Sequence, residues 1–303
     1  MLDSQSIQTI SAIVRLLLKE QNISYRVPPF DDKLFQESID EAVRRGYPMS
    51  DDHSLRRYLQ DGVNYVATTA RHYTHRPTQV WMVLYTAAAF YVDDVPFRFP
   101  SEIPKLYLFN DRFVKRQEQE NVVLDSLADI ICGAPDFFRP ILSNLITTST
   151  LDFVTSTLVD LETASMQISS AARQYPTYQR SLSGGAEAFV FMAFPPEVPL
   201  TMYIQALPEA LQFINELNDV LSFYKEELAG ENRNQISIMA ARNKESKLEI
   251  LRRVVDSILD LYKTIMEVLE GSPEASDAFR QFTVGFYHFH FAVQRYKLED
   301  LDL

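Results

Sequence analysis

The sequence predicts an all-α protein, and three observations support this fold class. Only 8 of the 303 residues are Gly, and the Asn-Gly and Asp-Gly pairs that form tight hairpin turns are few. Long segments repeat apolar residues at spacings of three and four, as on one face of a helix. Hydrophobic residues make up 46% of the chain, which is enough for a substantial core. We expect one domain, residues 1–303, built as a bundle of roughly ten or more helices.

Four helices are predicted in the first third of the chain. Gly46 and Pro48 end the second of them, and Pro77 begins the fourth, because proline is favoured in the first helical turn. Pro96 and Pro100 are expected to stop the fourth helix soon after an acidic pair. The predicted ranges are 6–19, 31–45, 54–72 and 77–94.

The remainder of the chain continues the helical pattern, without an internal repeat or a linker that would separate domains. A Gly184-Gly185 pair interrupts one helix, and a polar loop covers residues 229–234. The predicted ranges are 112–132, 137–174, 178–194, 199–227, 244–269 and 274–301.

Charge and composition exclude several classes of function. A net charge of −12 argues against nucleic acid, whose binding needs a basic face. Cys132 is the single cysteine, so an internal disulfide is excluded and a reducing compartment is favoured. No basic segment followed by an apolar run predicts a signal peptide, and no run of about 18 apolar residues predicts membrane insertion. We therefore expect a cytoplasmic protein.

A stripe of oxygen-bearing side chains is the strongest chemical signal. Asn218, Ser222 and Glu226 are spaced by four residues, so they share one face of a helix. Hard cations such as Mg²⁺ prefer oxygen ligands and accept the remaining oxygens from substrate phosphates. Apolar residues flank the stripe, as in a cavity wall, although Asn, Ser and Glu are also common on solvated faces. The stripe predicts a metal site that a polyphosphate completes.

A second acidic signal is the pair Asp93-Asp94, predicted at the C-terminal end of an apolar helix. Two carboxylates there oppose the helix dipole and repel one another, which favours a bound cation over a simple turn. Thr86, Ala89 and Phe90 precede the pair on the same helix. They form an apolar, partly aromatic face of the kind that would line a cavity for a hydrocarbon.

Four further residues could bind phosphate: Arg180, Lys225, Arg295 and Tyr296. Each is by itself more typical of the surface, and only their combination with the metal signals points to phosphate recognition. The five histidines lack the HExxH spacing of a zinc site. His72 and His75, at i and i+3, could bind a metal, although a solvated helix end is the favoured interpretation. His288 and His290 lie two residues apart, so at most one of them faces a cavity.

Longer motifs resemble the class I terpene synthases, specifically the fungal trichodiene synthase-like family. The family pattern Asn-Asp-x-x-Ser-x-x-x-Glu stands here at residues 218–226, continuing as Ser-Phe-Tyr-Lys-Glu and then as Gln-Ile-Ser at 235–237. The family's Arg-Tyr pair matches Arg295-Tyr296, and its diphosphate-sensing arginine matches Arg180. The likeness extends over about residues 81–298.

This resemblance implies a helical bundle around an apolar active-site cavity and a reaction with a prenyl diphosphate. Three Mg²⁺ ions, or Mn²⁺ in their place, would bridge the diphosphate. The Gly184-Gly185 break resembles a kink that brings a backbone carbonyl near the reacting carbon. The implied metal ligands are Asp93, Asp94, Asn218, Ser222 and Glu226; the implied diphosphate ligands are Arg180, Lys225, Arg295 and Tyr296; the implied hydrocarbon contacts are Thr86, Ala89, Phe90 and Gly185.

The sequence departs from the family pattern at the aspartate-rich motif. The family usually adds a third acid after the pair, where this chain has Phe97. Asp93 is still expected to ligate metal, with Asp94 as its neighbour, and Arg233 to help close the site.

The expected activity is ionisation of farnesyl or geranyl diphosphate to an allylic cation, with release of diphosphate. The product is then a sesquiterpene or monoterpene, either a cyclic hydrocarbon or an acyclic alcohol such as nerolidol or linalool. Bulky Phe90 favours the shorter substrate. The alternatives are a chain-elongating prenyltransferase and a silent helical scaffold, and the chain is expected to be a monomer or a homodimer.

Overall fold

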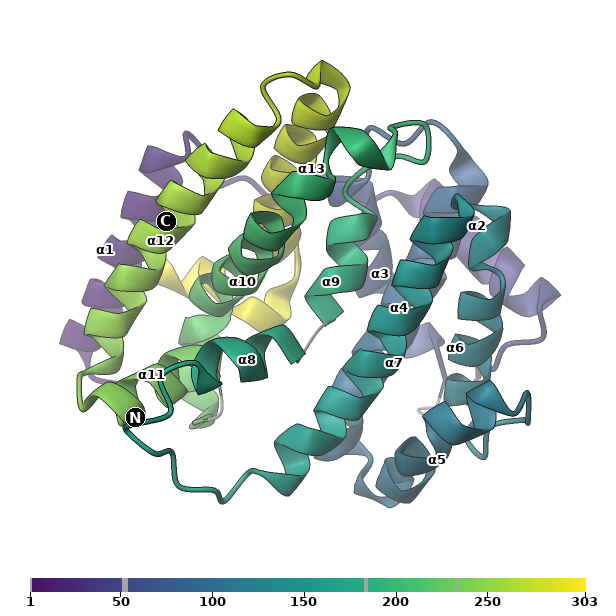
Figure 1. Ribbon diagram of the computed structural model, residues 1–303, viewed down its shortest axis with the longest axis horizontal. Coiled ribbons are helices and arrows are strands. Elements are labelled where there is room, and N and C mark those ends of the chain that lie inside the picture. Colours follow the sequence, from purple (N-terminus) through teal and green to yellow (C-terminus); the bar gives the residue numbers. More distant parts are fainter. Residues whose placement is uncertain (1, 51–53, 183–184, 233) are drawn as a thin grey trace. The chain divides into compact units, whose positions relative to one another are not determined.

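All the regular secondary structure in the described part of the chain is helical, which confirms the all-α fold class. The computed structural model describes residues 2–50, 54–182, 185–232 and 234–303. These residues form helices α1–α13 and short 3-10 turns, with no strand among them (Figure 1).

Contacts between residues group the chain into two compact units, described in turn. The first unit contains Met1–Pro28, Ala164–Leu182 and Val198–Leu303, and the second contains Pro29–Thr163 and Ser183–Glu197.

The second unit is organised around α4 (Arg76–Arg98), which contacts α2, α3, α6 and α7. Most α4 side chains are buried, which explains why its apolar residues occur on all sides of the helix. The Trp81 indole donates to the Ile130 carbonyl at 2.9 Å. The other helices are α2 (Asp32–Arg44), α3 (Arg56–Thr69), α5 (Ile103–Val114), α6 (Val122–Cys132), α7 (Pro140–Glu162) and α9 (Gly185–Phe191).

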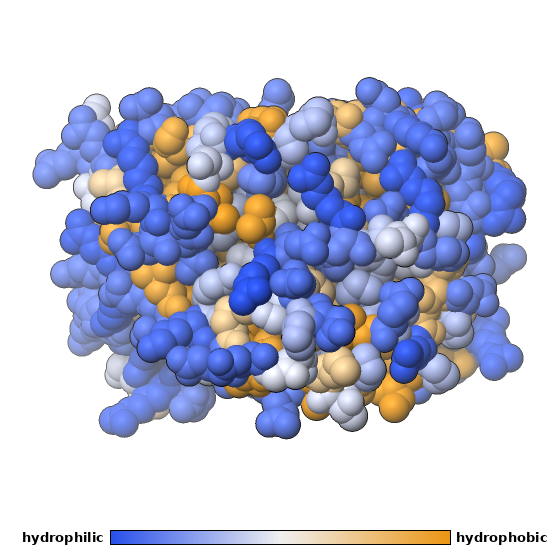
Figure 2. All heavy atoms as spheres, turned by 90° about the horizontal axis from the view of Figure 1, so that it is seen from above, coloured by the Kyte–Doolittle hydropathy of each residue, from blue (hydrophilic) through white to orange (hydrophobic). Residues whose placement is uncertain are grey.

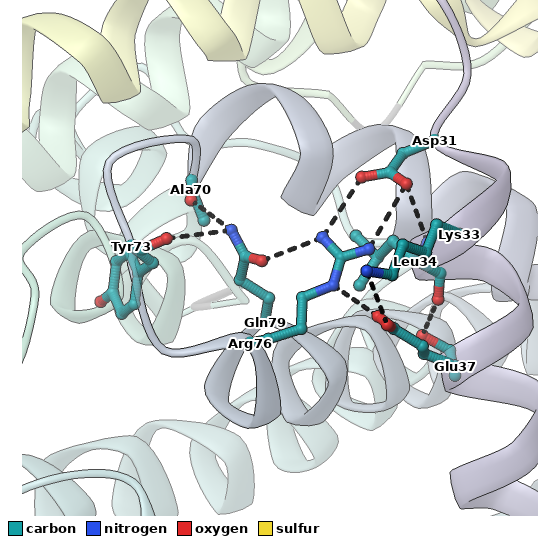
Figure 3. Close-up of polar contacts among 9 residues, drawn as sticks. Asp31, Lys33, Leu34, Glu37, Ala70, Tyr73, Arg76 and Gln79 are labelled. Atoms are coloured by element: carbon teal, nitrogen blue, oxygen red, sulfur yellow. Dashed lines mark hydrogen bonds and ion pairs between the residues drawn. The ribbon is translucent and has the colours of Figure 1, made fainter.

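Arg76 anchors the first turn of α4 to α2 and its N-cap (Figure 3). Its Nε lies 2.5 Å from a Glu37 oxygen, and its Nη1 lies 3.3 Å from Asp31. Arg76 also donates to Gln79, whose amide nitrogen donates to two carbonyls of the preceding loop. These contacts satisfy polar groups at the helix start and hold in place the helix that carries Asp93.

The first unit is built around α10 (Leu207–Ala229), which contacts α1, α8 and α12. Gly230, at φ 73°, ends α10 in the left-handed conformation that glycine adopts most readily. Phe213 of α10 contacts the rings of Tyr262 and Phe279. The other helices are α1 (Ser4–Glu20), α8 (Tyr175–Leu182), α11 (Gln235–Asn243), α12 (Lys247–Val268) and α13 (Pro273–Ala292).

Several predicted helix boundaries are wrong. The predicted helix 112–132 covers the end of α5 and all of α6. Arg116, at φ 55°, interrupts the helical conformation between them, and the Asn121 side chain caps the start of α6. The predicted helix 137–174 ends at Glu162. Helix α11 was not predicted, and its N-cap is the Asn234 side chain, which accepts from the Ser237 amide. Caps of this kind act over a few residues and interrupt an apolar pattern that otherwise looks continuous.

Two further boundaries bear on the site. Helix α4 passes through Pro96 and ends at Arg98. A proline so close to the C-terminus removes a single backbone hydrogen bond, and the Phe99 amide still reaches the Val95 carbonyl at 3.1 Å. The aromatic helix α13 ends at Ala292, so Arg295 and Tyr296 lie in a separate 3-10 turn.

The face of the protein in Figure 2 is mostly hydrophilic, and its hydrophobic residues form small separate groups. Within the described ranges, every helix is too short or too polar to cross a membrane.

Candidate active site

Helix α10 presents the predicted stripe on one continuous helical face. It runs unbroken from Leu207 to Ala229, so the four-residue spacing of Asn218, Ser222 and Glu226 is realised. Ser222 is 1% exposed and Glu226 is 8% exposed, and Asn218 is half-buried. The stripe is therefore a largely buried polar strip within an apolar helix, as predicted, and the interpretation as a solvated face is wrong.

The oxygen atoms of the stripe fit a hard cation. The Ser222 hydroxyl is buried and has no hydrogen-bond partner among the described residues, an arrangement that costs free energy unless a ligand satisfies it. Within the same ranges, no group of three His, Cys, Asp or Glu side chains could hold a metal ion. The stripe instead combines one carboxylate with an amide and a hydroxyl oxygen, which suits Mg²⁺ with additional ligands from a substrate.

Glu226 is held by two neighbours. The Asn234 amide nitrogen donates to one of its oxygens at 2.8 Å. The Lys225 ammonium lies 3.6 Å from the other oxygen. Asn234 is also the N-cap of α11, so the position of the carboxylate is tied to the start of the next helix.

Arg180 of α8 lies against the same face of α10. Its guanidinium forms a two-pronged ion pair with Asp219, with Nη2–Oδ1 2.9 Å and Nε–Oδ2 3.1 Å. The same Nη2 donates to the Asn215 carbonyl at 3.2 Å and to Asn218 Oδ1 at 3.3 Å. Burial raises the pKa of Asp219 while Arg180 opposes that shift. The predicted phosphate-binding arginine is therefore beside the stripe, bound to an aspartate.

His290 of α13 contacts the other end of the Asn218 amide. Its Nε2 lies 3.3 Å from Asn218 Nδ2, and its Nδ1 lies 2.8 Å from the Phe286 carbonyl. Desolvation is the main reason why the pKa of His290 is lowered to about 3; the positive charges of Lys225 and Arg295 add to this effect, and the hydrogen bond to the Phe286 carbonyl opposes it. His290 is therefore neutral near pH 7. Its sequence position alone did not distinguish it from an ordinary core histidine.

Tyr296 and Lys225 complete this side of the site. The Tyr296 ring lies 4.3 Å from the His290 ring, measured between centroids. The Lys225 ammonium lies 5.6 Å from the centroid of the Tyr296 ring, within range of a cation–π interaction. Arg295 is half-buried in the same 3-10 turn. The first unit thus brings Arg180, Lys225 and Tyr296 together with the stripe.

The acidic pair on α4 has different surroundings. Asp93 is exposed and Asp94 is buried. Asp94 accepts a hydrogen bond from the Tyr58 hydroxyl at 2.9 Å and pairs with Arg98 at 2.7 Å. Because α4 continues to Arg98, the acidic pair does not end the helix. The expectation that only a bound cation would compensate both carboxylates is wrong for Asp94, since Arg98 and Tyr58 already contact it. Asp93 as a metal ligand stays a prediction.

The predicted hydrocarbon contacts lie in the second unit. Thr86 and Ala89 are buried and Phe90 is half-buried. The Thr86 hydroxyl donates to the Met82 carbonyl at 2.8 Å, so its polar atom is satisfied within the helix. A Cβ added to Gly185 would meet the Phe153 ring of α7 at 3.4 Å, so Gly185 lies beside that aromatic side chain. Their contact with a substrate stays a prediction.

Three other expectations concern neighbouring positions. Phe97, at the place of the third acid, is 65% exposed. Arg233 and Gly184 lie outside the described residues, so the closing arginine and the full Gly184-Gly185 break stay predictions.

Comparisons with known proteins identify the family. The sequence model of trichodiene synthase matches residues 43–302. Alpha-cuprenene synthase of Coprinopsis cinerea is 34% identical over 294 residues, covering 96% of this chain and 90% of that protein. Terpene synthase BipA of Cochliobolus sativus is 30% identical over 299 residues, covering 95% and 89%.

Solved structures share the fold. The linalool/nerolidol synthase of Streptomyces clavuligerus superposes with a TM-score of 0.65 at 14% identity, covering 88% of this chain and 98% of that one. Hedycaryol synthase in complex with nerolidol gives a TM-score of 0.58 at 14% identity, covering 88% and 98%. The family match spans most of the chain and includes the oxygen-bearing stripe of α10, so this protein belongs to the trichodiene synthase family and is a terpene synthase.

Proposed function

We propose that this terpene synthase ionises farnesyl or geranyl diphosphate in a Mg²⁺-dependent reaction. The observation that carries the proposal is the buried oxygen stripe of α10, in which the Ser222 hydroxyl has no partner among the described residues. The relatives support the substrate class. One is named alpha-cuprenene synthase, and the linalool/nerolidol synthase was solved in complex with 2-fluorogeranyl diphosphate, at a TM-score of 0.66 to this chain.

Asn218, Ser222 and Glu226 would hold one metal ion, and Asp93, with Asp94 beside it, would hold the other two. Bound Mg²⁺ supplies positive charge that stabilises the leaving diphosphate. Manganese, with similar oxygen preference, would serve in its place.

Cationic side chains near the stripe would bind the diphosphate oxygens. Lys225 already lies between Glu226 and the Tyr296 ring, and Arg295 is in the same turn as Tyr296. Arg180 is bound to Asp219, so its contact with diphosphate requires it to share or exchange that partner. Such charge-assisted contacts are stronger than neutral hydrogen bonds and favour the separated ions.

The hydrocarbon would lie against apolar residues, Thr86, Ala89, Phe90 and Gly185 among them. An apolar wall keeps water away from an allylic cation, and an aromatic face stabilises it. A closed wall gives a cyclic hydrocarbon, whereas early access of water gives an acyclic alcohol such as nerolidol or linalool. We also propose that the enzyme works in the cytoplasm, because a single cysteine suits a reducing compartment. As to its oligomeric state, we propose a monomer or a homodimer.

The direct test is incubation of the protein with Mg²⁺ and geranyl, farnesyl or geranylgeranyl diphosphate. Volatile products and released diphosphate are measured, with chelator as the control. A terpene with stoichiometric diphosphate supports the proposal and reports the chain-length preference. Longer prenyl diphosphates would instead identify a chain-elongating enzyme, and absence of turnover with all three substrates would identify a silent scaffold.

A further inference from the structure

His290 and Asn218 form a part-buried contact between α13 and α10, within the first unit. His290 is 1% exposed, and each of its ring nitrogens has a partner. Nδ1 lies 2.8 Å from the Phe286 carbonyl, one turn earlier on the same helix. Nε2 lies 3.3 Å from the Asn218 amide nitrogen.

The first of these contacts determines which ring nitrogen carries the proton. A carbonyl oxygen can only accept, so Nδ1 must be the donor to Phe286. In a neutral imidazole the other nitrogen, Nε2, is then an acceptor. Its partner must donate, so the NH₂ group of the Asn218 amide faces His290.

Arg180 determines the opposite end of the same amide. Its Nη2 lies 3.3 Å from Asn218 Oδ1, and a guanidinium can only donate. A flipped amide would place NH₂ against the guanidinium and oxygen against the acceptor Nε2, which would lose both hydrogen bonds. The hydrogen-bond network therefore permits one orientation of the amide.

We propose that His290 is a positioning residue that keeps the Asn218 amide oxygen directed towards the metal. This inference rests on the proposed metal site. An amide oxygen has two lone pairs, and Arg180 uses one of them, which leaves the other for a cation. A flipped amide would present a donor group to the cation and remove one of the three ligands on α10. Partners of this type orient metal ligands and tune their affinity.

Packing holds the imidazole ring and suggests matched variants. The Phe286 and Tyr296 rings lie 4.7 Å and 4.3 Å from it, between centroids. His290→Phe keeps an aromatic ring there but removes both nitrogens. His290→Gln offers an amide oxygen that can accept from Asn218. Tyr287→Phe is the control, because Tyr287 is fully buried on the same helix and its hydroxyl has no partner among the described residues.

The test measures Mg²⁺ affinity by calorimetry in the presence of saturating inorganic pyrophosphate. We expect His290→Phe to weaken the apparent affinity by about 10- to 100-fold. His290→Gln should recover most of this loss, and Tyr287→Phe should match the wild type. A folded His290→Phe variant with an affinity within about twofold of wild type would overturn the role of His290. A wild-type protein that binds no Mg²⁺ would instead overturn the metal site itself.

A second measurement needs no destabilising variant. The wild-type protein is labelled with ¹⁵N at its histidines, and the His290 signals are assigned by their loss in His290→Gln. We expect a neutral ring protonated at Nδ1, with Nε2 shifted as a hydrogen-bond acceptor. A ring protonated at Nε2 would overturn the inference even if His290→Phe failed to fold, because Asn218 could then not donate to it.

Discussion

The two acidic signals of this protein, on α10 and on α4, differ in how their side chains are supported. On α10, Asn218 lies between His290 and Arg180, and Glu226 is held by Asn234. On α4, Asp93 is exposed, whereas Asp94 is already paired with Arg98 and Tyr58.

The difference teaches that burial and partners, more than the number of carboxylates, prepare a metal ligand. The α10 stripe has one carboxylate, but hydrogen bonds already hold the side chains of Asn218 and Glu226 in place, which would reduce the cost of ordering them on cation binding. The α4 pair has two carboxylates, yet Asp94 is committed to its neighbours and Asp93 is exposed. We therefore expect substitutions on α10 to have larger effects than those on α4.

Glu226→Gln should have the largest effect. It removes the only carboxylate of the stripe while it preserves the size of the side chain and an oxygen acceptor. We expect turnover to fall on the order of 10³-fold, as for loss of a group that stabilises the leaving charge. Steady-state kinetics measure the loss, and an unchanged circular dichroism spectrum shows that the fold is intact. Near-normal activity would contradict the metal assignment.

The acidic pair of α4 should respond unequally. Asp93→Asn is expected to reduce turnover by about 10²-fold, because Asp93 would be the ligand. Asp94→Asn should reduce it by about 10-fold or less, because its oxygen can still accept from Tyr58. The comparison uses the Mg²⁺ dependence of turnover for both variants. Equal and negligible effects would remove this pair from the site.

The stability of the fold should decrease at acid pH because of His290, which lies on α13 and contacts Asn218 of α10. The pKa of His290 is lowered to about 3 by burial, whereas an unfolded histidine titrates near 6.5. The unfolded state therefore binds the proton first as pH falls. The contribution of His290 to the free energy of unfolding is complete above about pH 6.5 and decreases by about 1.4 kcal/mol per pH unit below it.

Urea unfolding at pH 7 and pH 5 measures this change. Between the two pH values, the free energy of unfolding should decrease less for His290→Gln than for the wild type. Identical decreases would show that His290 does not titrate in this way.

Tyr58→Phe should have the smallest effect. It removes the hydroxyl that donates to Asp94, but Arg98 still pairs with that carboxylate. We expect a loss of about 1 kcal/mol in the free energy of unfolding, and turnover within about threefold of wild type, equivalent to less than 1 kcal/mol. Thermal unfolding and steady-state kinetics measure the two effects. A loss of activity as large as that of Asp93→Asn would mean that Tyr58 and Asp94 are part of the reacting site.

The sequence predicted the helical class and the face shared by Asn218, Ser222 and Glu226, because both depend on the period of a single helix. It failed where short-range capping interrupts an apolar pattern, as at Arg116 and Asn121. It also misplaced the end of α4, because a proline near a helix end removes one hydrogen bond without stopping the helix.

The sequence by itself therefore indicated the family and placed the oxygen atoms of Asn218, Ser222 and Glu226 on one face of α10. Tertiary structure alone decided that Arg180 binds Asp219, that Tyr58 donates to Asp94, and that His290 contacts the Asn218 amide. The physical reason is that a helical period relates residues within about one or two turns. Most of these partners come from other helices, and their hydrogen bonds form only when those helices pack.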